Sequence, residues 1–240
     1  MKNLAIIPAR GGSSRIPNKN IRIFNGKPLI YYTIKQAQQS KLFDKVVVDT
    51  NSPEIAKIAK KYGAEVPFLR PEYLATSKAK IGDAIEYLLK RLKREQKYIP
   101  RIITVLQTTS PLREIQDIKA CYKVMSNPKI KSASTICETS PWFFHLSKEN
   151  KLILVNKKAA KSSNTQEVKK GYLLNGCMVF MIKTSFFMKI KQLTDMAGGQ
   201  TVGVLCPRWR SVDLDYPEDW VLAELLYRNK NKISEKLKKF

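Results

Sequence analysis

A run of basic residues and glycines near the N-terminus has the composition of a phosphate-binding loop. Two adjacent glycines, Gly11 and Gly12, follow an apolar run that ends in Pro8. Glycines at such a turn let backbone N–H groups approach an anion closely. The same loop carries three cations: Arg10, Arg15 and Lys19. The wording is neither Gly-Lys-Ser/Thr nor Gly-x-Gly-x-x-Gly, and a tight turn with solvated cations is the alternative interpretation.

Two aspartates near the other end of the chain form a second candidate cluster. Asp213 and Asp215 alternate along a segment that we expect to be extended, which places both carboxylates on one side. Mg²⁺ prefers oxygen ligands and also accepts phosphate oxygens and water. The pair therefore predicts a magnesium site. Glu218 and Asp219 are explained by the first turn of the helix that follows.

A neutral polar segment follows a predicted strand in the middle of the chain. Gln107, Thr109 and Ser110 supply an amide and hydroxyls, which can bind sugar hydroxyls directionally. Ser110-Pro111 also fits the cap of the next helix, and the two roles are compatible.

These segments together resemble the acylneuraminate cytidylyltransferases, the CMP-sialic acid synthetase family. The family opening reads approximately Ile-Pro-Ala-Arg-Gly-Gly-Ser, followed later by Gly-x-Pro-Leu-Ile. Other family segments read Arg-Pro-x-x-Leu-Ala, Leu-Gln-Pro-Thr-Ser-Pro-Leu-Arg, Asn-Gly and Asp-x-Asp-x-Pro-Glu-Asp. The similarity covers about residues 3–225, and the matching segments are 7–13, 15–17, 19–20, 26–30, 70–75, 106–113, 175–176 and 213–219.

The resemblance implies transfer of CMP from CTP to the anomeric hydroxyl of a sialic-acid-like nonulosonic acid, with release of pyrophosphate. It implies Mg²⁺ as cofactor on Asp213 and Asp215, with Arg10 and Lys19 completing the catalytic set. The implied CTP-binding residues are Ala9, Arg10, Gly11, Gly12, Ser13, Arg15, Lys19, Asn20 and, at the base, Arg70. The implied sugar-binding residues are Gln107, Thr109, Ser110 and Asn175.

The chain departs from the family wording at several positions. Ser14 stands where the family usually has lysine, and residues 77–83 retain only Ala79 and Asp83 of the usual pattern. Residues 161–170 lack the usual arginine-rich stretch, and residues 49–51 read Asp-Thr-Asn where relatives have Ser-Thr-Asp. Two alternatives stay open: a catalytically impaired homologue that binds nucleotide, and a cytidylyltransferase for legionaminic, pseudaminic or an eight-carbon 2-keto acid.

Strands alternate with helices along the first half of the chain, which predicts an α/β fold with a mostly parallel sheet and helices on both faces. The resemblance implies the three-layer, Rossmann-like form of the nucleotide-diphospho-sugar transferases. Ligands of such sheets bind beyond the carboxyl ends of the strands. Strands are predicted at 3–8, 45–49, 102–106, 132–137, 178–182 and 201–205, with a short extended piece at 66–69. Helices are predicted at 28–39, 53–62, 81–97, 115–125 and 217–227.

The alternation stops between residues 138 and 171. Two short apolar runs flank the polar segment 147–150, which predicts an inserted β-hairpin followed by a lysine-rich loop. The resemblance implies that this region makes a dimer contact, so we expect a homodimer. We expect one cytidylyltransferase domain over residues 1–227 and a basic tail over residues 228–240.

The amino-acid composition limits the classes of partner that we expect. The net charge of +24 favours anionic partners, but the lysines are scattered, which indicates a solvated surface and no specific nucleic-acid partner. No apolar run has the length of a membrane span, and the N-terminus lacks a secretory signal, so we expect a cytoplasmic enzyme without a membrane partner. The four cysteines are not closely spaced and only one histidine exists, His145, so neither a zinc site nor a disulfide framework is expected.

Overall fold

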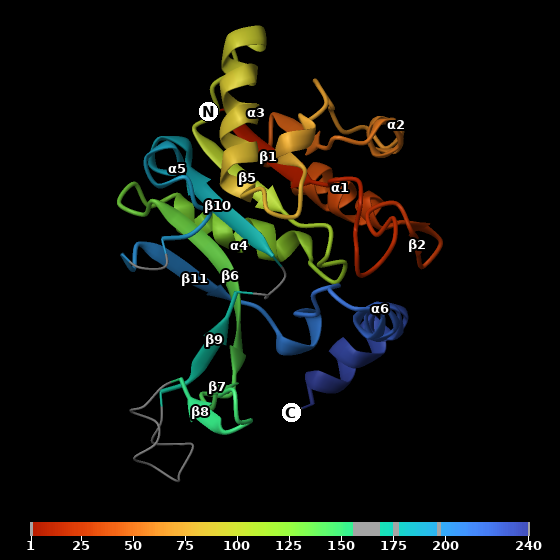
Figure 1. Ribbon diagram of the computed structural model, residues 1–240, viewed down its shortest axis with the longest axis vertical. Helices are drawn as coiled ribbons and strands as arrows, with labels where there is room; N and C mark the ends of the chain where they lie inside the picture. Colours follow the sequence, from red (N-terminus) through yellow and green to blue (C-terminus); the bar gives the residue numbers. More distant parts are fainter. Residues whose placement is uncertain (1, 156–168, 175–177, 196–197, 240) are drawn as a thin grey trace.

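A seven-stranded sheet forms the centre of the protein in a computed structural model, which describes residues 2–155, 169–174, 178–195 and 198–239 (Figure 1). Six strands run in the order β11-β6-β10-β5-β1-β4, and β9 pairs with the end of β6. Along that path only β10 is antiparallel to its neighbours, so the predicted mostly parallel sheet is confirmed. The strands are β1 (Asn3–Pro8), β4 (Lys45–Asp49), β5 (Ile102–Leu106), β6 (Ser132–Thr139), β9 (Gly171–Leu173), β10 (Val179–Lys183) and β11 (Thr201–Leu205).

Helices cover both faces of this sheet, as predicted. Side chains alternate along β1, so Ala5 and Ile7 face one apolar core while Leu4 and Ile6 face the other. The first core also contains residues of α1 (Leu29–Ser40), α2 (Pro53–Lys61) and α4 (Ile115–Met125). The second contains residues of α3 (Ile81–Gln96) and α5 (Thr184–Ile190). Burial of apolar surface on both sides fixes the sheet between the two helical layers.

The ends of two helices show how local sequence sets the framework. Ser52 caps α2 by accepting a hydrogen bond from the Ile55 N–H at 3.3 Å, with proline at the first helical position. Asp219 accepts from the Tyr216 N–H at 2.7 Å and starts α6 (Pro217–Leu237). Helix α6 continues ten residues beyond the predicted end near Tyr227, because no glycine or proline interrupts it.

Some elements differ from the prediction. Residues 66–69 form no strand, although Val47 and the preceding Glu65 make an isolated parallel bridge. A small hairpin of β2 (Ile23–Phe24) and β3 (Lys27–Pro28) was not predicted, nor was α5. Two short 3₁₀ turns, η1 (Glu72–Leu74) and η3 (Arg208–Arg210), lie in segments that carry site residues.

The predicted inserted hairpin is present as β7 (Phe144–Leu146) and β8 (Leu152–Leu154), which pair antiparallel. It projects from one end of the molecule, beyond β6 and β9 (Figure 1). Residues 157–168 of the predicted lysine-rich loop lie outside the described residues. Among the helices that the structure describes, none combines the length and apolar character needed to cross a lipid bilayer.

Candidate active site

The glycine-containing loop lies at the carboxyl ends of β1 and β4, where ligands of parallel sheets bind. The Ala9 N–H donates to the Asp49 carbonyl at 2.9 Å, so the hydrogen bonding between β1 and β4 continues into the start of the loop. Gly12 has a φ of +67°, a left-handed conformation that favours glycine. Its exposed position leaves room for a ligand beside the backbone, since no atom beyond its two chain neighbours lies within 4 Å of where a Cβ would stand.

Asn20 holds the other end of this loop. Its Nδ2 donates to the Arg10 carbonyl at 3.0 Å, and its Oδ1 accepts from the Thr108 hydroxyl at 2.6 Å. The side chain is 8% exposed, so the structure gives Asn20 a supporting position and leaves its predicted contact with CTP a prediction. The bond to Thr108 ties the basic loop to the polar segment that follows β5.

The two aspartates are held at the same edge by backbone hydrogen bonds. The Leu214 N–H donates to the Thr109 carbonyl at 3.0 Å, and Lys19 Nζ donates to the Leu214 carbonyl at 2.5 Å. The Asp215 N–H donates to the Asp213 carbonyl at 2.9 Å, so the expected extended segment is wrong and a tight turn takes its place. Leu214 points into the core, and both aspartates act electrostatically on Lys19.

Opposite charges meet around the Lys19 ammonium. Burial lowers the pKa of Lys19, while Asp215 and Asp213 act in the opposite direction. Burial also raises the pKa of the Asp213 carboxyl, with the neighbouring Asp215 charge adding to the shift. Arg15 forms an ion pair with Asp215, Nη1 to Oδ1 at 3.1 Å. The cluster therefore combines cations that suit phosphate with carboxylates that suit a metal ion.

The aspartates fit the implied Mg²⁺. Asp213 Oδ1 is buried and makes no hydrogen bond of normal geometry in the described part of the chain, although the nearby Thr109 side chain acts to lower the pKa of this carboxyl. A buried carboxylate oxygen without a partner is costly unless a ligand satisfies it. No group of three or more histidine, cysteine, aspartate or glutamate side chains suited to a metal occurs among the described residues, so water and phosphate oxygens would complete the coordination.

The other predicted site residues have more varied positions. Arg70 is 7% exposed, and its Nη2 donates to Asp49 Oδ2 at 2.6 Å, so it supports the end of β4. Ser110 is fully buried, with no hydrogen-bond partner in the described residues for its hydroxyl. Gln107 is half-buried directly after β5, and its predicted contact with the sugar stays a prediction. Asn175 lies outside the described residues.

Arg113 is a supporting residue to which the sequence motif gave no role. Its Nη1 donates to the carbonyls of Gln107 at 2.9 Å and Met178 at 3.0 Å, and its Nη2 donates to the Thr33 hydroxyl at 2.9 Å. It is almost completely buried, 2% exposed, and therefore joins the segment after β5 to the segment before β10. The arginine is visible in the sequence, but its partners are far away in the chain.

A buried ion pair gives similar support to the aspartates. Arg210 in η3 donates to both carboxylate oxygens of Asp117 in α4, at 2.6 and 2.9 Å. Both residues are less than 10% exposed. Because η3 ends three residues before Asp213, this pair anchors the acidic turn to α4.

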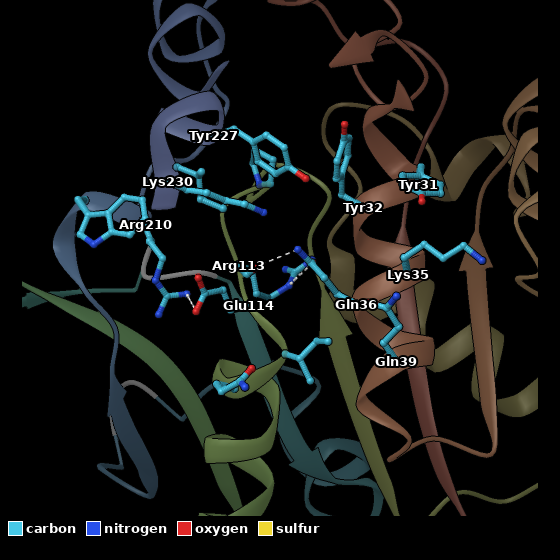
Figure 2. Close-up of a pocket in the computed structure, with 15 residues that line it drawn as sticks. Tyr31, Tyr32, Lys35, Gln36, Gln39, Arg113, Glu114, Arg210, Tyr227 and Lys230 are labelled. Atoms are coloured by element: carbon cyan, nitrogen blue, oxygen red, sulfur yellow. Dashed lines mark hydrogen bonds and ion pairs between the residues drawn. The ribbon is translucent and has the colours of Figure 1, made fainter. Parts of the chain in front are cut away.

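A cavity of about 320 Å³ lies behind these supports, between α1, the start of α4 and α6 (Figure 2). Tyr31, Tyr32 and Tyr227 line it together with Arg113 and Arg210. None of the predicted site residues lines it, and both arginines have protein partners. The cavity is therefore distinct from the cluster at the strand ends.

Fold and site together define a nucleotidyltransferase: a basic glycine loop and an acidic turn meet at the carboxyl ends of parallel strands. The chain belongs to the cytidylyltransferase family, whose model matches residues 4–192. The predicted family and reaction class are thereby confirmed.

Curated relatives match the chain along most of its length. It is 35% identical to a pseudaminic acid cytidylyltransferase of Campylobacter jejuni, over 95% of this chain and 97% of the relative. It is 31% identical to a CMP-N,N'-diacetyllegionaminic acid synthase of Legionella pneumophila, over 94% and 96%. An N-acylneuraminate cytidylyltransferase of Escherichia coli is 30% identical over 96% of this chain, which spans 53% of that relative.

Solved structures confirm the fold class. A CMP:2-keto-3-deoxy-manno-octonic acid synthetase complexed with CTP has a TM-score of 0.68 at 16% identity, covering 96% of this chain and 100% of that one. A 4-diphosphocytidyl-2C-methyl-D-erythritol synthase of Anaerococcus prevotii has a TM-score of 0.64 at 10% identity, over 95% and 98%.

Proposed function

We propose that this cytidylyltransferase couples CTP to a nonulosonic acid, a nine-carbon 2-keto sugar acid. The observation that carries the proposal is the meeting of the basic loop, the polar segment after β5 and the acidic turn at one edge of the sheet. Three relatives whose names specify such sugar acids, at 30 to 35% identity, support this substrate class. The reaction uses CTP, which is consistent with a cytoplasmic enzyme.

In the proposed reaction the anomeric hydroxyl oxygen of the sugar attacks the α-phosphorus of CTP. The bond from that phosphorus to the bridging oxygen breaks, the hydroxyl proton passes to solvent, and CMP-sugar and pyrophosphate form. No covalent enzyme intermediate is required. The protein contributes position and charge, because Arg10 and Lys19 hold the phosphates while the carbonyls of Ala75 and Leu214 orient the two cations.

Mg²⁺ would be held by Asp213 and Asp215 and would neutralise phosphate charge while acting as a Lewis acid. Arg15, now paired with Asp215, lies beside the same site. We propose that it contributes positive charge to the phosphates where the family's usual lysine is replaced by the exposed Ser14.

A substrate panel tests the proposed function. Pyrophosphate release is measured with CTP, Mg²⁺ and, in turn, pseudaminic, legionaminic and N-acetylneuraminic acids, with an eight-carbon 2-keto acid as comparison. Turnover with one of the nine-carbon acids is the expected result. Pseudaminic and legionaminic acids are the first candidates, because the relatives named for them match over nearly their whole length. CTP binding without turnover on any acid would indicate a non-catalytic homologue.

The metal assignment makes a separate prediction. Asp215→Asn removes a carboxylate charge from the acidic turn, and we expect it to lower kcat by about 100-fold or more. Glu218→Gln removes the same charge from an exposed position in the same segment and should leave kcat nearly unchanged. Mg²⁺ titrations of initial rate, with thermal unfolding to verify the fold, provide the measurement. Normal Mg²⁺-dependent turnover in Asp215→Asn would refute the assignment.

A further inference from the structure

A short chain of hydrogen bonds connects the basic loop to the 3₁₀ turn η1. The Gly11 N–H donates to Asn51 Oδ1 at 2.8 Å. Asn51 Nδ2 then donates to both carboxylate oxygens of Glu72, at 3.1 and 3.0 Å. Gly11 follows β1, Asn51 follows β4 and Glu72 begins η1. These hydrogen bonds therefore join three segments that are distant in sequence.

Only a side chain that both accepts and donates hydrogen bonds can stand between the Gly11 N–H and the Glu72 carboxylate. The amide of Asn51 has one oxygen and one NH₂ group, which match the Gly11 N–H and the Glu72 carboxylate respectively. An aspartate at this position would offer acceptors only. Its negative charge would then face the Glu72 carboxylate at about 3 Å, and repulsion between the two carboxylates would separate residues 51 and 72.

The turn η1 supports the loop at a second point. Arg10 Nη1 donates to the carbonyl of Ala75, the residue directly after η1, at 3.4 Å. Gly11 also lies against the segment after β4, because a Cβ on it would stand 3.3 Å from the Ser52 Cβ. The short turn is therefore linked to two neighbouring residues of the basic loop: to the Arg10 side chain through the Ala75 carbonyl, and indirectly to the Gly11 backbone through Asn51.

We propose that Asn51 and Glu72 are a positioning pair for the cytidylyl transfer, which holds the Arg10–Gly11 turn in the orientation that receives the triphosphate of CTP. The inference rests on the proposed role of residues 9–20 in binding the phosphates. Glu72 follows the segment of Arg70 that the family resemblance assigns to the base. The pair thus links the base side of the nucleotide site to its phosphate side.

A double-mutant cycle tests the pair. Asn51→Asp places two carboxylates together, and we expect the KM for CTP to rise about tenfold while kcat changes little. Glu72→Gln keeps an acceptor for Asn51 and should leave the KM near that of the wild type. In the double variant the amide introduced at position 72 can donate to the carboxylate introduced at position 51. That carboxylate still accepts from the Gly11 N–H, so the KM should return close to wild type.

The outcomes separate the pair from simpler explanations. A double variant as impaired as Asn51→Asp would overturn the proposal. A purely electrostatic effect of charge near the phosphates would instead lower the KM of Glu72→Gln well below that of the wild type, because this variant removes a negative charge, and that result would also overturn the proposal. So would an unchanged KM in Asn51→Asp. Direct CTP binding by calorimetry gives a readout that does not depend on turnover, and it should follow the KM across the cycle.

Two further variants address the cases in which Asn51→Asp does not fold or the basic loop does not bind the CTP phosphates. Should Asn51→Asp not fold, Glu72→Ala removes the acceptor from an exposed site and should still raise the KM by about threefold, whereas Glu54→Ala, also exposed, should not. An unchanged KM in Glu72→Ala would then overturn the pair. Arg10→Ala tests the loop itself: a normal KM there would refute the phosphate-loop assignment, independently of the pair.

Discussion

At the scale of single residues, the Arg15 side chain already has interaction partners within the site. Arg15 pairs with Asp215 and its guanidinium lies 4.9 Å from the centre of the Tyr216 ring. Both sides of the pair are about half exposed, so the pair is weak and can exchange partners when phosphates arrive. Ser14 beside it is exposed and adds no charge. The sequence could place these residues in one loop, but it could not show that Arg15 already has a carboxylate partner.

Tyr32 gives a prediction for stability at alkaline pH. Burial raises the pKa of Tyr32 to about 12, and its hydroxyl donates toward the carbonyls of Phe24 and Asn25. The unfolded chain ionises a tyrosine near pH 10, so the folded state is favoured below that pH and loses this contribution between about pH 10 and 12.

Burial also raises the pKa of Tyr98 and Tyr227, so several tyrosines lower the stability over this window. We expect Tyr32 to contribute on the order of 2 kcal/mol of the fall in the free energy of unfolding, so that Tyr32→Phe loses less than the wild type by about that amount. Urea unfolding at pH 9 and near pH 12 measures the difference between the two proteins. Equal losses in both would show that other groups, and not Tyr32, determine the alkaline limit.

At the scale of elements, the buried ion pair of Arg210 and Asp117 joins η3 to α4 and thereby anchors the acidic turn that follows η3. Removing one partner of a buried pair leaves the other charge without compensation. We expect Arg210→Met to lower the free energy of unfolding by about 3 kcal/mol. Arg210→Met combined with Asp117→Asn should recover part of this loss, because the asparagine oxygen can still accept from the Glu114 N–H at the helix start.

Urea unfolding of the two variants and the wild type at pH 7 provides the measurement. Arg22→Met is the matched control, since it removes an exposed arginine that lies over the Trp220 ring. A loss in Arg210→Met no greater than in Arg22→Met would show that the pair does not stabilise the fold.

Elements with strong local signals were predictable and those set by distant packing were not. Ser52-Pro53 determines where α2 begins, and the alternating core faces of β1 are fixed by its own side chains. Strand β10 is antiparallel, but an apolar run such as residues 179–182 has the same pattern in either direction. Helix α5 has no side-chain cap and is held by Phe186 and Phe187 against the sheet, a contact that the sequence alone does not reveal.

At the scale of the whole molecule, the β7–β8 hairpin exposes apolar side chains that have little cover among the described residues. Both strands are exposed along most of their length, and the exposed set comprises Phe143, Phe144, Leu146, Leu152, Ile153 and Val155. An apolar patch of this kind commonly marks a protein interface. We propose on this basis that the expected homodimer forms through the hairpin, which contacts a second copy of the chain.

We expect the wild-type protein to sediment as a dimer, at twice its chain mass of 27.5 kDa, and Leu152→Glu to shift it toward the monomer. The substituted residue is exposed, so the monomer should remain folded. Lys148→Glu, in the turn of the same hairpin, changes the charge without touching the apolar set and serves as control. A wild-type protein that sediments as a monomer at assay concentrations would refute the proposed dimer.

Arg113 has a consequence for how the enzyme can be redesigned. One guanidinium binds the carbonyls of Gln107 and Met178, which lie in or next to the two segments expected to face the sugar, so these segments share a single anchor. A loop transplanted from a relative with another sugar preference would therefore need its counterpart transplanted with it. Changes of sugar preference should accordingly arise through paired substitutions on both sides of this arginine, while the nucleotide side of the enzyme is left as it is.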